Sequence, residues 1–169
     1  SWKAATRPPR DASTLTIVLF AAETCVYLRD AKRAEILYQL LEENVGSNLM
    51  SDFGGPCLGS ADRLLGNLAV VLLQWEKEQA LFETTLEMDK RTGARVWLAH
   101  SRFDFASMLH RRAHEGDAER AVQLLELALV DSSTLGMEAL TPGIKALTQN
   151  LATPRPKHPC GLTEREVGV

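Results

Sequence analysis

Three stretches of the chain carry the same pattern of mainly apolar residues at a nearly constant spacing. Within each stretch four residues stand at relative positions 0, 3, 4 and 7, which places them on one face of an α-helix. The three sets are Ala34, Leu37, Tyr38 and Leu41; Glu78, Leu81, Phe82 and Thr85; and Ala121, Leu124, Leu125 and Ala128. Their first members are 44 and 43 residues apart. A period of this length predicts stacked helical hairpins.

A second helical pattern precedes each of these stretches and predicts the first helix of each hairpin. Its residues are Leu15, Val18, Leu19, Ala22 and Val26; Ala61, Leu65, Leu68, Ala69 and Leu72; and Leu98, Ser101, Phe105, Met108 and Leu109. Small residues such as Ala22, Gly66 and Ala69 allow two helix backbones to approach closely. Because glycine inside a helix costs up to ~1 kcal/mol in propensity, Gly66 is expected to have a packing role.

Glycine and proline divide the chain into segments, and the low aromatic content without alternating β-branched residues favours helices alone. The predicted helices are 13–28, 31–45, 57–74, 76–92, 95–112, 117–135 and 137–152. They form hairpins 13–45, 57–92 and 95–135 plus a last helix 137–152, between an N-terminal extension 1–12 and a proline-rich linker 153–160. The prediction is therefore an all-α fold of about seven helices. Trp75 and Trp97 are interpreted as core or inter-repeat wedges.

Composition limits the classes of function. The 169 residues carry 19 Lys plus Arg against 22 Asp plus Glu, a net charge of -3, so strong binding of nucleic acid by this chain itself is disfavoured. The three cysteines are widely spaced, which fits a reducing cytoplasm better than a secreted disulfide framework. The longest apolar runs, such as Leu68 to Leu73, are far shorter than the ~20 residues that span a bilayer. We therefore expect a cytoplasmic protein without a membrane segment.

Candidate chemical groups do not assemble into a catalytic pattern. His110 and His114 share a predicted helix face at a spacing that a metal ion could use, but a third ligand is not evident, and a solvated helix end is the preferred interpretation. Cys57 is predicted to begin a helix, where a thiol pKa can be lowered, while Cys25 packs as a small hydrophobe and Cys160 lies in the tail. Carboxylates including Glu42, Glu43, Glu76, Glu78, Glu83, Glu87 and Asp89 are assigned to solvated faces. We expect no enzyme activity, no cofactor and no metal.

Stacked hairpins create extended concave surfaces, so we expect a binding groove. Its candidate residues come from the first helices of the hairpins: Arg63, Asn67, Arg102 and Asp104. The expected occupants are a protein or peptide, another domain of the same protein, or a small ligand.

The middle repeat resembles the tetratricopeptide repeat. Its Leu65-Gly66, Ala69, Trp75, Phe82 and Leu86 match the spacing of that family's Leu-Gly, Tyr, Tyr, Phe and Leu positions, and Ala34 and Ala121 match its small residue at the start of the second helix. Glu78 and Thr85 depart from the alanine that the family prefers, and the repeats are longer than thirty-four residues. The resemblance implies a tetratricopeptide-like right-handed superhelix over about residues 13–152.

The segment from Gly161 to Val167, Gly-Leu-Thr-Glu-Arg-Glu-Val, resembles the opening of the LuxR-type helix-turn-helix domain, and Thr163 with Glu166 has the spacing of a capping box. Segments 34–41, 57–60 and 91–99 resemble the repeat region of large regulators that place an ATPase module, sometimes preceded by a cyclase-like domain, before the repeats. Residues 161–169 would then be the truncated start of the DNA-binding domain. A recognition helix would lie downstream of Val169.

The resemblance implies a non-catalytic interaction or sensor domain that relays binding of a ligand or partner to a DNA-binding domain missing from this chain. DNA binding would belong to the parent regulator. Two alternatives remain open: a structural or oligomerisation spacer, which includes a homodimer, and a stand-alone tetratricopeptide-like scaffold.

Overall fold

A computed structural model describes residues 12–51 and 56–153 of the chain. The elements are α1 (Ala12–Leu28), α2 (Ala31–Leu41), the 3-10 turn η1 (Glu42–Asn44), β1 (Asn48–Met50), β2 (Cys57–Ser60), α3 (Ala61–Leu72), α4 (Trp75–Thr92), α5 (Arg95–Arg112), α6 (Asp117–Thr134) and α7 (Thr141–Ala152). Seven α-helices thus dominate the described residues, which confirms the all-α prediction. The expected extension, linker and helix-turn-helix start lie almost entirely outside them.

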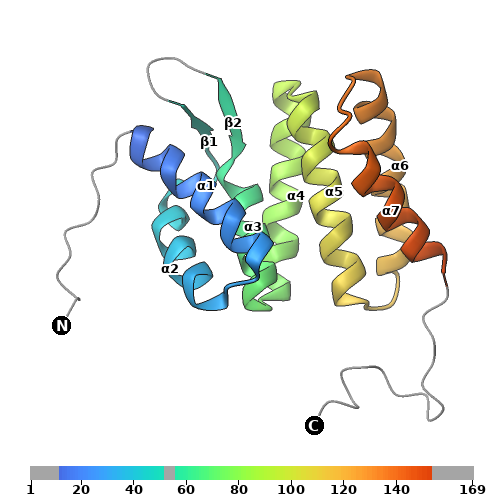
Figure 1. Cartoon of the computed structure of the whole chain (residues 1–169), viewed down its shortest axis with the longest axis horizontal. Helices are drawn as coiled ribbons and strands as arrows, with labels where there is room; N and C mark the ends of the chain where they lie inside the picture. Colours follow the sequence, from blue (N-terminus) through green and yellow to red (C-terminus); the bar gives the residue numbers. More distant parts are fainter. Residues whose placement is uncertain (1–11, 52–55, 154–169) are drawn as a thin grey trace, which may run out of the picture.

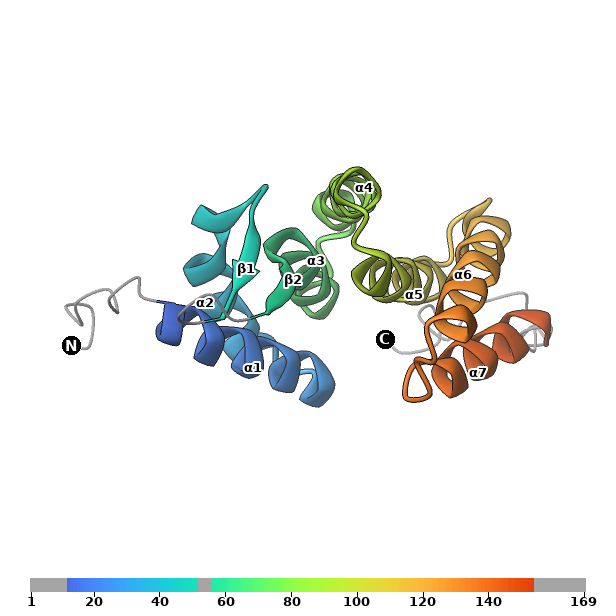
Figure 2. The same ribbon diagram turned by 90° about the horizontal axis from the view of Figure 1, so that it is seen from above.

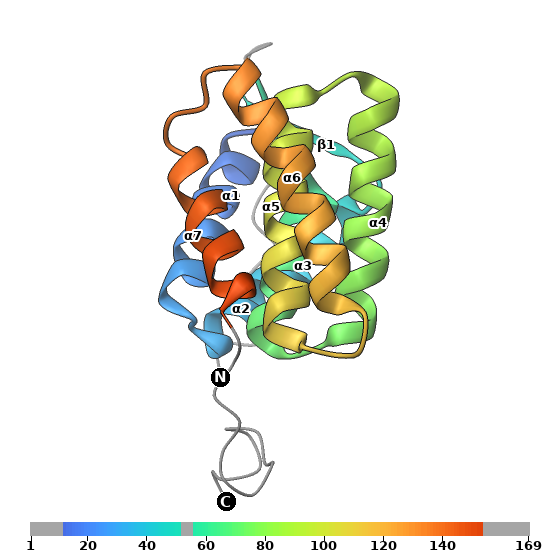
Figure 3. The same cartoon turned by 90° about the vertical axis from the view of Figure 1, so that its right-hand side faces the viewer.

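Consecutive helices pack against one another from α1 to α7, and α5 with α6 has the most extensive contact. Figure 1 shows α1 and α7 at opposite ends of this stack. Seen from above, the helices form an arch with α4 at its crown and with α1 and α7 at its two lower ends (Figure 2). From the C-terminal end of the stack, α6 runs beside α5, and α7 packs on α6 (Figure 3).

The helix ends follow from local sequence. Asp30 caps α2 by accepting a hydrogen bond from the backbone NH of Arg33, and Ser60 caps α3 in the same way with Asp62. The chain turns after each first helix through a residue in the left-handed region: Arg29, Leu73 and Ala113, with φ of 54°, 58° and 54°. The same backbone turn therefore recurs in all three hairpins, although none of these residues is glycine.

The connection between α2 and α3 contains a feature that the sequence does not predict. Cys57–Ser60 pairs antiparallel with Asn48–Met50, so the prediction of helices alone was wrong at this point. The predicted helix 57–74 begins only at Ala61, and Cys57 lies in a strand instead of beginning a helix. Likewise, the predicted helix 31–45 ends at Leu41 and tightens into a 3-10 turn. The hairpin is anchored because Leu49 is buried in the core.

The predicted stripes form the core. Leu41, Phe82 and Leu125 are fully buried members of the repeated set, and Ala34 and Ala121 are buried at its first position. The buried residues form two clusters. The N-terminal cluster combines residues of α1, α2, β1 and α3, and the C-terminal cluster combines Val70 of α3 with residues of α4, α5, α6 and α7. The boundary between the clusters therefore runs through α3.

Gly66 has the packing role that its sequence context predicts. A Cβ at this position would lie 3.0 Å from Cζ of Phe82, so glycine allows the ring of α4 to rest on the backbone of α3. Phe82 in turn stacks on Phe105, with ring centroids 5.4 Å apart. This contact joins α3, α4 and α5.

Candidate functional site

Four polar side chains from α1, α3 and α5 meet in one cluster. Arg63 donates from Nη1 to Oδ2 of Asp104 at 2.7 Å and from Nη2 to Oε1 of Glu23 at 3.0 Å. Asn67 lies one turn after Arg63 and donates to the same Asp104 oxygen at 2.8 Å. We call Glu23, Arg63, Asn67 and Asp104 the first-helix cluster.

Arg63 is the centre of this cluster and is only 5% exposed. Burial acts to lower its pKa, but the carboxylates of Asp104 and Glu23 outweigh burial and raise the pKa above its usual value. Its guanidinium carbon also lies 5.5 Å from the ring centroid of Trp97, within the range of a cation–π contact. Among the described residues, Nε of Arg63 is buried without a hydrogen-bond partner. The arginine is therefore held on several sides as a fixed positive charge.

His100 of α5 lies beside the cluster and against Trp97, at 5.7 Å between ring centroids. Burial, followed by the positive charge of Arg63, lowers the pKa of His100, so its imidazole is neutral at pH 7. Two carboxylates then face one guanidinium, and the cluster carries a net negative charge. The side chain of Glu23 is 48% exposed and that of Asp104 is 17% exposed, so this charge is open to solvent.

The structure brings together three of the four predicted groove residues. Arg63, Asn67 and Asp104 meet, whereas Arg102 of α5 forms a buried ion pair with Asp131 of α6. The cationic groups of Arg63 and Arg102 are buried in ion pairs, so the charged groups of the site that face solvent are carboxylates.

Glu23, Trp97 and His100 belong to the site but were missed from the sequence. A periodicity signal existed for one of them: Glu23 lies 44 residues before Asn67, which is the repeat spacing.

Two carboxylates assigned to solvated faces are buried instead. Glu78 is fully buried, and both its side-chain oxygens lack a hydrogen-bond partner within the described part of the chain. Burial raises its pKa to about 7, although Arg111 and Arg112 act in the opposite direction. Asp89 is 2% exposed and accepts a hydrogen bond from Ser101 at 2.7 Å, and burial raises its pKa as well. The expectation of solvation was wrong for both because they stand on the helix faces that meet neighbouring helices.

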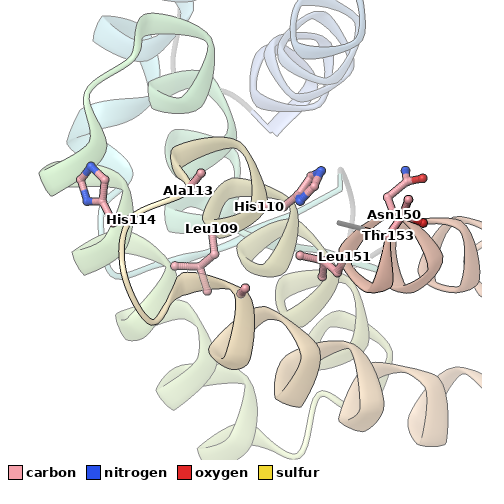
Figure 4. Close-up of a pocket in the computed structure, with 8 residues that line it drawn as sticks. Leu109, His110, Ala113, His114, Asn150, Leu151 and Thr153 are labelled. Atoms are coloured by element: carbon pink, nitrogen blue, oxygen red, sulfur yellow. The ribbon is translucent and has the colours of Figure 1, made fainter. Parts of the chain in front are cut away.

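His110 and His114 do not share a helix face. α5 ends at Arg112, and the left-handed Ala113 turns the chain before His114. His110 points toward Asn150 and Leu151 of α7, whereas His114 points away (Figure 4). Both line a shallow cavity of about 230 Å³ between α5, α6 and α7. Within the described ranges, we find no group of three or more His, Cys, Asp or Glu residues that could hold a metal ion.

The cysteines and tryptophans have structural surroundings. Cys25 is buried as predicted, its thiol donates to the backbone oxygen of Asp30 at 3.1 Å, and burial raises its pKa, which disfavours the reactive thiolate. Trp75 packs against the C-terminal cluster, and Trp97 lies between Gly59 and Arg63, so both act as the wedges that the sequence predicts. Cys160 is outside the described residues.

Comparison with known proteins provides no assignment: no protein-family model, curated protein or solved structure matches this chain significantly. In the part of the chain that the structure describes, none of the helices combines the length and apolar character needed to cross a membrane. Functional inference therefore depends on the site itself.

Proposed function

We propose that this chain is a non-catalytic interaction module of tetratricopeptide-like type, whose first-helix cluster binds a cationic group of a protein or peptide partner. The observation that carries the proposal is the convergence of Glu23, Arg63 and Asp104 from three successive first helices. Repeat proteins use this geometry to present one continuous surface made by several units.

The charge balance of the cluster favours a cation. Arg63 satisfies one oxygen each of Glu23 and Asp104, and the remaining carboxylate oxygens can accept hydrogen bonds from a lysine or arginine of the partner. Because Arg63 is held by both carboxylates and by Trp97, the acceptors are positioned before the partner arrives. Such preorganisation reduces the entropy lost on binding.

Peptide selection on the immobilised chain tests this proposal. We expect enriched peptides to carry lysine or arginine and their affinity, measured by titration calorimetry, to fall at least tenfold with the double substitution Glu23→Gln and Asp104→Asn. Glu87→Gln changes an exposed carboxylate of α4 and is the matched control. Peptides that bind the double variant and the wild type equally would show that the cluster is purely structural.

We further propose that this binding is relayed to the DNA-binding domain of a LuxR-type regulator. The support is the resemblance of residues 161–167 to the start of such a domain. Determining the coding sequence on both sides of this segment tests the idea. We expect a continued helix-turn-helix downstream and an ATP-binding loop upstream, whereas stop codons at both ends would favour a stand-alone scaffold.

A further inference from the structure

One face of α1 is apolar and open to solvent. Its residues are Ile17, Phe20, Ala21, Thr24, Tyr27 and Leu28, all of which are exposed. Ile17 is 68% exposed, Phe20 59% and Tyr27 86%. Their spacing of three, four and seven residues places them on one side of the helix. We call these six residues the α1 face, and α1 lies at the end of the stack (Figure 1).

The equivalent face of α3 is a helix-packing face. Arg29 and Leu73 make the same left-handed turn 44 residues apart, so Ile17, Phe20, Ala21 and Thr24 correspond to Ala61, Leu64, Leu65 and Leu68. The latter four are at most 1% exposed, and α3 packs on the preceding helix α2. The α1 face is therefore equivalent to a face of α3 that packs against another helix.

The other end of the stack differs in chemistry. The exposed residues of α7 include Lys145, Thr148, Gln149 and Asn150, which are polar. Stacks of repeats are kept soluble by polar outer faces on their terminal units. The outer face of α7 is polar in this way, whereas the α1 face is apolar. We therefore expect another protein surface to cover the α1 face.

The α1 face is suited to a second copy of itself. Glu23 is the only charged residue between Ala12 and Leu28, and it is not part of the α1 face, so the six residues of the face bring no charge into the contact. Thr24 donates its hydroxyl hydrogen bond to the backbone oxygen of Phe20 at 2.8 Å, so its polar group is already satisfied within the helix.

The sizes of the side chains along the face are symmetric about its centre. Two large residues stand at each end and two small residues, Ala21 and Thr24, stand in the middle. Antiparallel helices would place Ala21 and Thr24 of both copies at the centre, with the large side chains of one copy opposite those of the other. We propose that the chain forms a dimer through antiparallel packing of two α1 faces about a two-fold axis near residues 22 and 23. Such an isologous contact closes on itself and uses one patch twice.

Sedimentation equilibrium of the 169-residue chain over about 1–100 µM tests the proposal, a range that brackets micromolar association. We expect a mass that rises toward twice that of the chain. Thr24→Arg, which places two positive charges beside the axis, should weaken dimerisation at least tenfold. The matched control Val130→Arg alters an apolar residue of α6 that is 63% exposed and lies outside the α1 face, and it should leave dimerisation unchanged.

A mixture of Thr24→Arg and Thr24→Glu provides a second measurement, which depends on residue 24 of both copies lying near the axis. The two variants should associate with each other more tightly than either does alone, and circular dichroism should show that both keep the helical content of the wild type. A wild-type chain that stays monomeric would overturn the proposal and point to a different occupant, such as a helix of another protein. A dimer that Thr24→Arg leaves intact would also overturn it.

Discussion

Phe82 of α4 lies directly against the backbone of α3 at Gly66, where a Cβ would be 3.0 Å from its Cζ. Because Phe82 is fully buried and stacked on Phe105, the ring has little room to retreat. We expect Gly66→Ala to destabilise the protein by about 1–3 kcal/mol, although alanine is the better helix former.

Chemical denaturation measures this change in the free energy of unfolding. The same measurement on Phe82→Leu and on the double variant Gly66→Ala, Phe82→Leu tests whether the two residues are coupled. The smaller side chain should make room for the added methyl group, so the two changes should be less costly together than their sum. Strict additivity would show that the contact between residues 66 and 82 does not limit the packing of α3 on α4.

Glu78 should make stability depend on pH. Its pKa is raised from 4.5 to about 7, so the native state holds a proton that the unfolded chain releases between these values. The contribution to stability is therefore present below about pH 4.5 and is lost as the pH rises through 7. Each pKa unit corresponds to about 1.4 kcal/mol. The free energy of unfolding of Glu78→Gln, relative to that of the wild type, should therefore be about 3 kcal/mol higher at pH 8 than at pH 4.

Unfolding free energies at several pH values measure this difference. Glu83→Gln, which alters an exposed carboxylate on the same helix, is a suitable control because its pKa is lowered and its effect should have the opposite sign. A wild type and a Glu78→Gln variant with parallel pH profiles would contradict the burial of Glu78 as a protonated acid.

Arg112 and Asp117 close the turn between α5 and α6 through two hydrogen bonds, of 2.9 Å and 2.6 Å. Asp117 also accepts from the backbone NH of His114, and the hydrogen bonds from Arg112 hold its pKa below the usual value. Both side chains are largely buried, so Asp117→Asn should cost about 3 kcal/mol at pH 7 by leaving Arg112 without its counter-charge.

Because the pKa of Asp117 is lowered, its contribution to stability is present above about pH 3.8 and disappears as the pH falls through its native value. The difference between wild type and Asp117→Asn should consequently shrink toward pH 2. Glu119→Gln, an exposed change two residues along α6, should alter stability by less than about 0.5 kcal/mol at either pH.

Substitutions at Gly59 and Gly46 separate the effect of backbone strain on stability from the effect of steric contact. Both have positive φ, of 99° and 75°, but a Cβ at Gly59 would lie 3.0 Å from the Trp97 ring, whereas a Cβ at Gly46 would meet nothing within 4 Å. Alanine should be destabilising at either position, by about 1–3 kcal/mol, and more so at residue 59. The indole NH resonance of Trp97 should shift in Gly59→Ala and remain in place in Gly46→Ala.

The sequence predicts the helices and the core because both depend on local periodicity. Phe82 and Leu125 occupy the same place in successive repeats, and each is buried as their shared spacing requires. The strand at Cys57–Ser60 was missed because its pairing with Asn48–Met50 is set by a loop closure that no periodicity encodes.

The candidate site was predictable only in part. The sequence places Arg63 and Asp104 as charged residues on first helices. Their mutual hydrogen bond depends on how closely α3 and α5 approach, which the spacing of residues along each helix does not specify. The charge of Glu78 favours a solvated face, whereas its position in the repeat favours the core. Glu78 occupies the stripe place that holds Ala34 and Ala121 in the neighbouring repeats.

Arg63 is one of the polar links between the two core clusters, together with Asn67, which donates to the same oxygen of Asp104. Glu23 belongs to α1, whose core residues lie in the N-terminal cluster, and Asp104 belongs to α5, which is built into the C-terminal cluster. A partner that draws Asp104 away from Arg63 would therefore reduce the cooperativity of unfolding between the two clusters. Occupation of a few surface oxygens could then be detected as altered amide hydrogen exchange in α6 and α7, which the partner does not touch.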